Sequence, residues 1–281
     1  LIEMLLDTHP QCFTLGEFQM LPSDLKEDNQ PCGCGSKVSS CEFWSQIYSD
    51  NKTLLDSGVI NKYRGGERNA GKVFRLEEIM DTMFNMPMNQ HECNAYGYDN
   101  FKILTAISRK LSSEGVTHLI DASKDPYRLK WLALSGYFNI YVIHIIKEPQ
   151  AMVYSFSKGR DGYLQTMYFT IRMTLRWIVE NLIIDKIIQK HISKNRALKV
   201  KYEDLAENSS DEMNRVFKFV SLTRNDLSLT NLGAKSHAIS GNAMRFNSKE
   251  VKLDKKWKKE MGVLSKLFVL LLTAPFRYLY K

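Results

Sequence analysis

Residues 140–155 read IYVIHIIKEPQAMVYS, and this stretch decides the fold class. Seven mostly apolar residues, largely β-branched, run into Lys147, and a helical pattern that carries Ser155 opens at Pro149. A strand without polar alternation is normally covered on both faces, which predicts a parallel sheet flanked by helices. Ligands of such sheets gather at the carboxyl ends of the strands, so Lys147 and Ser155 lie where an anion could bind.

A regular alternation of helices and strands surrounds this stretch. Residues 1–41 are expected to form a helix followed by a polar loop, and residues 42–98 irregular helical material, so that 31–98 is interpreted as a cap or insertion. The pattern predicts an α/β fold in one domain over residues 1–281. The expected elements beyond residue 100 are a helix at 101–115 that stops at Gly115, a strand at 117–123, a helix at 126–136, a helix from about 163 to 191, a strand within 197–205, a helix at 209–222 and two C-terminal helices.

Charge is unevenly distributed along the 281 residues. The net charge is +8, but residues 1–100 hold 8 Lys/Arg against 15 Asp/Glu (−7), and the remainder holds 31 against 16 (+15). This block suggests an anionic ligand, although the KKWKK run at 255–259 is better explained as a solvated surface. The apolar segment 267–275, LFVLLLTAP, is interpreted as a docked helix closed by Pro275 and too short to span a bilayer.

Three of the five cysteines are close together in PCGCGSKVSSCEFW, as Cys32, Cys34 and Cys41. The spacing lacks the paired C-x-x-C units of common zinc sites, and a fourth ligand is not evident. A zinc site, a disulfide and a loop of free thiols are the alternatives, and we favour the free thiols.

Polar residues follow the predicted strands in three places. In LIDASKDPYRL, Asp121, Ser123, Lys124 and Arg128 lie at a strand exit and helix start, where backbone N–H groups favour an anion. Lys124 or Arg128 could instead cap the strand turn or pair with Asp125. The other two places are IIKEPQAMVYS and the late loop SHAISGNAMRF. Three cationic segments on one edge of a sheet would suit a ligand with two phosphates.

These segments, in their order, resemble the sulfotransferase family. The shared elements are the HP and LGE of DTHPQCFTLGE, the CGCG…CEFW stretch, D-x-S-K-x-P-x-R, K-E-P with its following Ser, W-x-x-x-N, K-Y-E-D-L, and H-x-I-x-G-N-x-x-R. The family has a P-loop-like parallel sheet flanked by helices. Its members transfer a sulfuryl group from 3′-phosphoadenosine 5′-phosphosulfate (PAPS), a co-substrate that requires no metal, to an acceptor such as a carbohydrate, a tyrosine or a small molecule.

The resemblance, closest to the carbohydrate and tyrosylprotein branch, implies roles for two catalytic residues. Glu17 resembles the catalytic base, and Lys124 resembles the lysine that contacts the bridging oxygen of the leaving phosphosulfate. His9, His144 and His237 are alternative bases, although His144, on a buried strand, is better explained as a core residue.

The same resemblance implies four cofactor-binding residues. Lys147 and Ser155 match the pair that binds the 3′-phosphate, with one departure, because the family usually has Arg-Asp-Pro where this chain has Lys-Glu-Pro at 147–149. Lysine keeps the charge but loses the two-pronged hydrogen bonding of arginine. Ser240 and Arg245 resemble the loop that closes over the cofactor.

One family element is expected before Leu1. The 5′-phosphosulfate loop and the strand ahead of it are not found in the sequence, and LIEMLL resembles the helix that follows that loop. We therefore expect a fragment that by itself binds PAPS poorly. The compartment is left open, with the cytoplasm favoured and the Golgi lumen the alternative should a membrane anchor precede Leu1.

Two other functions compete with sulfuryl transfer. A P-loop kinase of a small metabolite would share the fold and the anion sites, but it would need carboxylates that hold Mg²⁺. A non-catalytic basic module would explain the charge, but neither an aromatic-basic nucleic-acid motif nor a convincing membrane anchor is found. We expect a hydroxyl acceptor as partner and no nucleic acid, and leave membrane association and oligomeric state open.

Overall fold

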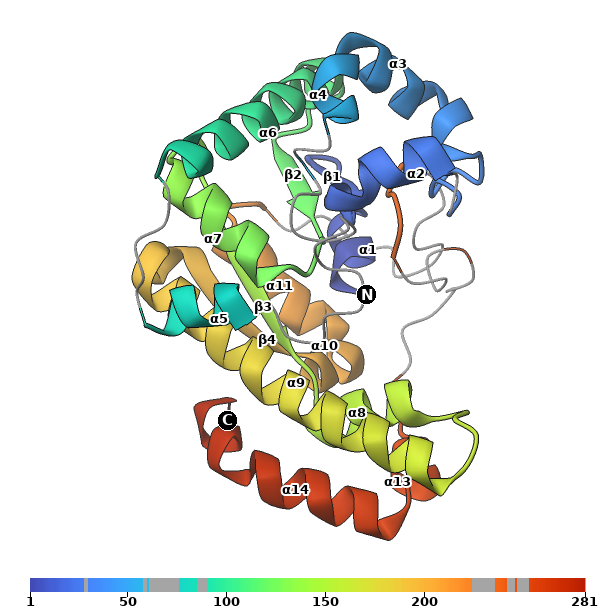
Figure 1. Ribbon diagram of the computed structural model, residues 1–281. Helices are drawn as coiled ribbons and strands as arrows, with labels where there is room; N and C mark the ends of the chain where they lie inside the picture. The colour runs from blue at the N-terminus through green and yellow to red at the C-terminus, as the bar shows by residue number, and fades with distance from the viewer. Residues whose placement is uncertain are drawn as a thin grey trace. The chain divides into compact units, whose positions relative to one another are not determined.

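The computed structural model describes residues 1–27, 30–57, 60, 76–84, 90–223, 236–241, 246 and 253–280. Contacts divide the chain into two compact units. Unit 1 holds the described residues within Leu1–Lys72, Met86–Ile140 and Val220–Val251, and unit 2 holds those within Val73–Asn85, Tyr141–Phe219 and Lys252–Lys281. Each unit contains a pair of parallel strands accompanied by helices (Figure 1).

Unit 1 is built on β1 (Cys12–Gly16) and β2 (His118–Asp121), which are parallel neighbours. The register shifts between Thr14 and Gly16, so Gly16 lies opposite the last residue of β2 and both strands end at the same edge. The other elements are α1 (Ile2–Leu6), η1 (Phe18–Met20), α2 (Leu21–Glu27), η2 (Val38–Ser40), α3 (Glu42–Asp50), α4 (Lys52–Asp56), α6 (Gln90–Leu111), η4 (Ser112–Glu114) and α7 (Pro126–Ser135).

The core of unit 1 lies where the residues after β1 meet α3 and α6. Phe18 and Trp44 have no exposed surface, and Ile103 of α6 packs in the same cluster. Burying an aromatic side chain of this size stabilises a fold by about 2–3 kcal/mol. The burial therefore ties the turn after β1 to the helices around it.

Unit 2 is built on β3 (Val142–Ile146) and β4 (Ala197–Lys201), which pair in parallel with Val142 opposite Ala197. Helices α8 and α9 form the crossover between these strands. The other elements and their bounds are α5 (Leu76–Met83), α8 (Pro149–Ser157), α9 (Tyr163–His191), η5 (Lys194–Arg196), α10 (Tyr202–Glu207), α11 (Ser209–Phe219), α13 (Trp257–Glu260), α14 (Val263–Arg277) and η6 (Tyr278–Tyr280).

The predicted α/β class with parallel strands and flanking helices is confirmed, but two details differ. The described strands form two sheets of two strands each, where a single sheet was expected. Strand β1 was placed in a polar loop, because CFTLG is short and its strand state depends on pairing with β2, far along the sequence. The prediction of a single domain with a cap at 31–98 stays a prediction.

The predicted docked C-terminal helix is present as α14, but it ends at a different residue than expected. Val269 packs with Val153 of α8 and Met173 of α9. The helix does not stop at Pro275 but continues to Arg277. A proline this close to a helix end removes one backbone hydrogen bond, which the final turn tolerates.

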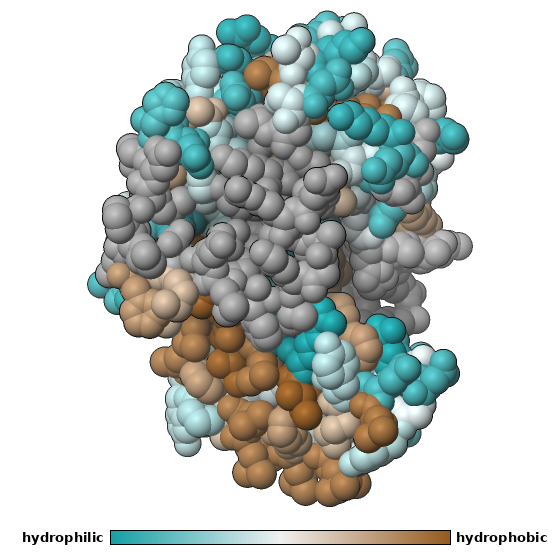
Figure 2. All heavy atoms as spheres, viewed as in Figure 1, coloured by the Kyte–Doolittle hydropathy of each residue, from teal (hydrophilic) through white to brown (hydrophobic). Residues whose placement is uncertain are grey.

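Most of the apolar surface of α14 is exposed. Figure 2 shows apolar side chains gathered over this helix, and Leu264 and Leu271 are among the exposed residues. The stretch Val263–Tyr280 is 18 residues long and has a mean hydropathy of 1.4, and 17% of it is buried. By length and composition it could cross a membrane. The sequence predicted, from residues 267–275 alone, a segment too short to span a bilayer. That prediction is wrong, because the apolar stretch is longer.

Candidate active site

Glu17 directly follows β1, and the backbone around it explains why glycine precedes it. Gly16 has a φ of +71°, and a Cβ there would lie 2.1 Å from the carbonyl oxygen of Ile239. The N–H of Glu17 donates to that same carbonyl at 2.8 Å. Only glycine allows this close approach in a left-handed conformation, so the Leu-Gly-Glu sequence fixes where the Glu17 carboxylate begins.

Lys124 lies in the turn after β2, beside Glu17. Its backbone is left-handed, with a φ of 57°, and its Nζ is 2.9 Å from Oε1 of Glu17. The lysine side chain is 58% exposed, whereas that of Glu17 is 14% exposed. The carboxylate is thus held within the fold while the ammonium can turn toward a ligand. The two predicted catalytic residues are brought together by the parallel pairing of β1 and β2.

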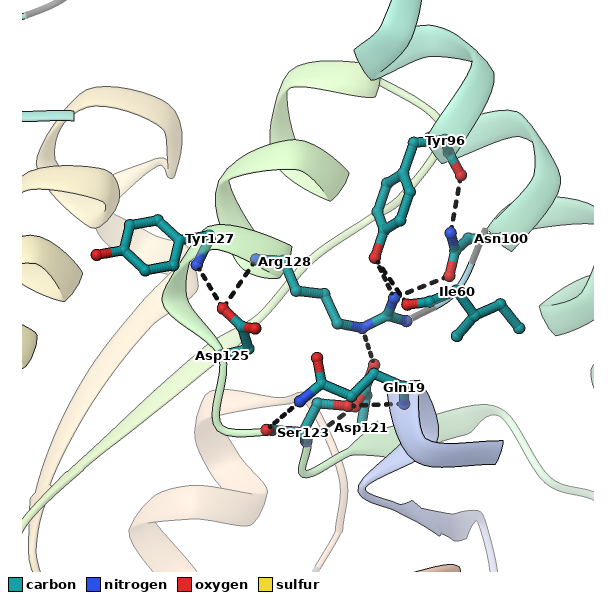
Figure 3. Close-up of polar contacts among 9 residues, drawn as sticks. All are labelled: Gln19, Ile60, Tyr96, Asn100, Asp121, Ser123, Asp125, Tyr127 and Arg128. Atoms are coloured by element: carbon teal, nitrogen blue, oxygen red, sulfur yellow. Dashed lines mark hydrogen bonds and ion pairs between the residues drawn. The ribbon is translucent and has the colours of Figure 1, made fainter. Parts of the chain in front are cut away.

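Arg128 has a structural role in place of the predicted anion contact. Its Nε is 2.9 Å from Oδ2 of Asp121, and its Nη1 donates to the hydroxyl of Tyr96 at 2.6 Å and to Oδ1 of Asn100 at 2.9 Å (Figure 3). The side chain is 3% exposed. Burial alone would lower the pKa of Arg128, but the neighbouring Tyr96 and the Asp121 carboxylate raise it by more, so the pKa lies above its ordinary value. Nε and Nη1 are thus engaged, and Nη2 is buried without a hydrogen-bond partner in the described part of the chain, so the side chain holds the turn and does not face solvent.

Acidic and hydroxyl side chains organise the rest of this turn. Asp125 caps α7 by accepting from the N–H groups of Tyr127 and Arg128, and it is not the partner of the arginine side chain. Ser123 donates through its N–H and hydroxyl to Asp121, and its carbonyl accepts from the Gln19 side chain at 2.9 Å (Figure 3). These bonds hold the turn in which Lys124 adopts its left-handed conformation.

Lys147 lies at the exit of β3 in unit 2, as predicted. Its Nζ is 5.0 Å from the ring centre of Tyr202, and burial lowers its pKa below the ordinary value, partly offset by the nearby carboxylates of Glu203 and Asp254. The N–H of Glu148 donates to Oε1 of Glu203 at 3.0 Å. The K-Y-E-D-L motif was noted in the sequence without a role, and its Tyr202 and Glu203 prove to surround the strand exit.

Two further contacts hold this exit in place. The indole N–H of Trp177 donates to the carbonyl of Lys147 at 2.9 Å. Glu148 forms an ion pair with Arg277 of α14, so the negative charge of Glu148 beside Lys147 is balanced by an arginine. Trp177 of W-x-x-x-N therefore fixes the backbone of the predicted phosphate-binding lysine.

Ser155 lies on α8 and is exposed. Its hydroxyl donates to the carbonyl of Met152 in the previous turn at 2.7 Å, and a serine on an exposed helix surface exchanges such a bond readily. Lys147 and Ser155 are therefore both in unit 2, on consecutive parts of one strand–helix connection.

Of the late-loop residues, Ser240 can be placed and Arg245 lies outside the described residues. The Ser240 hydroxyl donates to Oδ2 of Asp24 at 2.5 Å and is buried in unit 1. Asp24 was missed, because an aspartate inside a short helix has no sequence signal that links it to a serine 216 residues away.

The three histidines proposed as alternative bases all have defined surroundings. His144 is buried and its Nε2 bonds to Oδ1 of Asn181 at 2.9 Å, which confirms it as a core residue. His9 is buried, with one ring nitrogen bonded to the carbonyl of Thr223 and the other to the N–H of Gln11. His237 faces cysteine side chains in unit 1.

Comparison with known proteins shows the fold. No protein-family model matches the chain, and no curated protein sequence matches it. The sulfotransferase domain from the curacin biosynthetic pathway has a similar structure, with a TM-score of 0.51 and 11% identity over 97% of this chain and 92% of that chain. The sulfotransferase domain from the Synechococcus PCC 7002 olefin synthase aligns with a TM-score of 0.47 and 14% identity, over 96% and 95%. The chain therefore has an α/β fold of sulfotransferase type.

Proposed function

We propose that the chain transfers a sulfuryl group from PAPS to an acceptor hydroxyl. The observation that carries the proposal is the Glu17–Lys124 pair, in which a carboxylate and an ammonium lie 2.9 Å apart after two adjacent parallel strands. The sulfotransferase-type fold and the order of the sequence motifs support the same conclusion.

The proposed step is a displacement at sulfur. The acceptor oxygen forms a bond to sulfur, its proton passes to Glu17, and the bond from sulfur to the bridging oxygen breaks. The electron pair stays on the departing oxygen of 3′-phosphoadenosine 5′-phosphate, where the Lys124 ammonium stabilises it. Because attacking and leaving oxygens stand on opposite sides of the sulfur, the ion pair must open when substrates bind.

The remaining roles in the proposal follow the family resemblance. Lys147 and Ser155 would bind the 3′-phosphate, and Ser240 and Arg245 would belong to the loop that closes over the cofactor. The acceptor class, whether carbohydrate, tyrosine or small molecule, follows from none of the contacts of Glu17 and Lys124.

The proposal is tested by single-turnover release of 3′-phosphoadenosine 5′-phosphate from PAPS with a reactive phenol as acceptor, at PAPS concentrations high enough to offset the poor binding expected from the sequence. Glu17→Gln and Lys124→Ala should each lower the rate roughly 100-fold, the usual size of general-base or charge assistance. Lys102→Ala is the matched control, since Lys102 belongs to another exposed lysine–carboxylate pair of unit 1, at 3.5 Å from Asp99.

Wild-type rates in both Glu17→Gln and Lys124→Ala would overturn the assignment of the pair. Thermal stabilisation of the full chain by ATP with Mg²⁺, without any stabilisation by PAPS, would identify a kinase instead.

A further inference from the structure

Three cysteines of one loop and one histidine from a distant segment converge in unit 1. Cys32, Cys34 and Cys41 come from the segment between α2 and α3, and His237 comes from the segment that runs beside β1. Their ligand atoms, three Sγ and one imidazole nitrogen, all lie within 4.8 Å of one another. Cys32 and Cys41 are buried, whereas Cys34 is exposed, so the group is open to solvent on one side.

Three distances within this group are close to the edges of a tetrahedron around a zinc ion. With Zn–S bonds of about 2.3 Å and a Zn–N bond of about 2.0 Å, tetrahedral geometry places two sulfurs about 3.8 Å apart and a sulfur and a nitrogen about 3.5 Å apart. The Sγ atoms of Cys34 and Cys41 are 3.7 Å apart. Nδ1 of His237 is 3.3 Å from Sγ of Cys41 and 3.8 Å from Sγ of Cys32.

The imidazole of His237 is held so that Nδ1 faces the sulfurs. Its ring stacks on Phe43 with centroids 5.1 Å apart, and its carbonyl accepts from the indole N–H of Trp44 at 2.6 Å. The next residue, Ala238, accepts from the N–H of Gly33 at 2.9 Å. A Cβ on Gly33 would lie 2.5 Å from the carbonyl oxygen of Ser236, so the glycine between the first two cysteines permits this contact.

Backbone N–H groups also point at the sulfurs. Cys32 accepts from the N–H of Cys34, and Cys34 accepts from that of Ser36. Cys41 accepts from the first turn of α3, where the donors are the N–H groups of Phe43 and Trp44. Such donors offset part of the cost of burying negative charge on sulfur.

We propose that Cys32, Cys34, Cys41 and His237 bind one Zn²⁺ ion in a structural site, with no coordination position left for a substrate. Three thiolates and one imidazole form a set that zinc prefers, and all four tetrahedral positions are filled by protein atoms. A disulfide is the weaker explanation, because it would use two sulfurs and leave a third thiol and an oriented imidazole unexplained. All five cysteines lie in the described part of the chain, and none is in a disulfide there.

The site would fasten the 32–41 loop to the segment that contacts Glu17. Ile239, two residues after His237, bridges to Gly16 and accepts from the N–H of Glu17. Zinc therefore positions the backbone of Glu17 indirectly and does not touch the reacting atoms.

The first test is the metal content of the full chain, purified without chelator and measured by plasma mass spectrometry. One zinc ion per chain is expected. Replacement by Co²⁺ should give the visible bands of tetrahedral cobalt and a thiolate charge-transfer band in the near ultraviolet, as sulfur-rich tetrahedral sites do.

The second test uses single substitutions chosen to preserve the fold. Cys34→Ser removes the exposed ligand, so it creates no cavity, and zinc affinity should fall roughly 100-fold as one of four bonds is lost. His237→Asn should have a similar effect. Cys12→Ser is the matched control, since Cys12 is buried in unit 1 outside the group, and it should keep one zinc ion.

Removal of zinc should also lower the hydrogen-exchange protection of the Glu17 N–H without unfolding unit 2. A folded chain with less than a tenth of an equivalent of zinc after dialysis against Zn²⁺ would overturn the proposal. So would a disulfide between Cys34 and Cys41, or a Cys34→Ser variant that binds zinc as tightly as the wild type.

Discussion

At the exit of β2 in unit 1, Arg128 is buried and bonded through Nε and Nη1 to Asp121, Tyr96 and Asn100, while Lys124 stays exposed. At the exit of β3 in unit 2, Lys147 rests over the ring of Tyr202 and its neighbour Glu148 is paired with Arg277. Both connections place a lysine between a strand and a helix that begins with proline.

The difference teaches that a cation at a strand exit is not by itself an anion site. A buried guanidinium with several hydrogen bonds inside the fold contributes to stability, and turning it toward a ligand would break those bonds. A lysine whose own ammonium is exposed can exchange its carboxylate partner for a substrate at little cost. The following predictions test this distinction, beginning with the largest expected effect.

Arg128→Met should lower the free energy of unfolding by about 3–5 kcal/mol, because it removes the charge-assisted bonds of a buried guanidinium to Asp121, Tyr96 and Asn100. Lys124→Met, at the exposed end of the same turn, should cost less than about 1 kcal/mol. Urea denaturation of both variants measures the difference. Equal costs would remove the distinction between the structural and the available cation.

Gly16→Ala should cost about 3 kcal/mol or more, because its Cβ would collide with the Ile239 carbonyl as well as strain the backbone. Gly136→Ala is the matched control, with a φ of +74° and open space around the added methyl group, and should cost about 1 kcal/mol. Thermal unfolding of the two variants compares them. A Gly16→Ala cost no greater than that of the control would show that the Glu17 backbone does not depend on this close approach.

Asp7→Asn should make the stability of unit 1 less dependent on pH. Burial raises the pKa of Asp7 to about 6, and its Oδ1 accepts from the N–H of Thr14 in β1, a bond that an asparagine oxygen keeps. Because the folded pKa is raised, the protonated carboxyl stabilises the fold below about pH 4, and this contribution is lost as the pH rises through about 6.

The wild type should therefore lose about 2 kcal/mol relative to Asp7→Asn between pH 4 and pH 7, after allowance for the partial exposure of the carboxyl. Urea denaturation of both proteins at the two pH values gives the difference. A constant difference across this range would contradict the raised pKa.

Lys147→Ala should weaken binding of 3′-phosphoadenosine 5′-phosphate at least tenfold, about 1.4 kcal/mol, if Lys147 binds the 3′-phosphate. Lys147→Arg should bind at least as well as the wild type, since a guanidinium donates two hydrogen bonds to a phosphate. Lys199→Ala is the control in the same unit, because Lys199 of β4 is already paired with Asp185 of α9. Calorimetry in which the Arg variant binds as poorly as the Ala variant would remove the assignment.

Much of the fold could be predicted from local pattern. Helix α9 was expected from about 163 to 191 and spans Tyr163–His191, and helix ends were marked by Gly115 and Gly136, both left-handed. The strand exits at Lys124 and Lys147 followed from apolar runs that end in polar residues. Periodicity and glycine stops act over a few residues, so the sequence by itself carries this information.

Only the tertiary structure decided which residues meet. Strand β1 exists through its pairing with β2, and the pairing is what brings Glu17 to Lys124. The structural role of Arg128 depends on its hydrogen bonds to Tyr96 and Asn100, which lie on α6 and belong to no sequence motif.

The cysteine group shows the same division most clearly. Its three cysteines were evident in the sequence, but the spacing alone left zinc, a disulfide and free thiols as alternatives. His237, 196 residues from Cys41, joins them because its segment bridges to the end of β1. Local sequence determines where a helix or strand begins and ends, whereas a ligand set is decided by long-range contacts that only the packed fold creates.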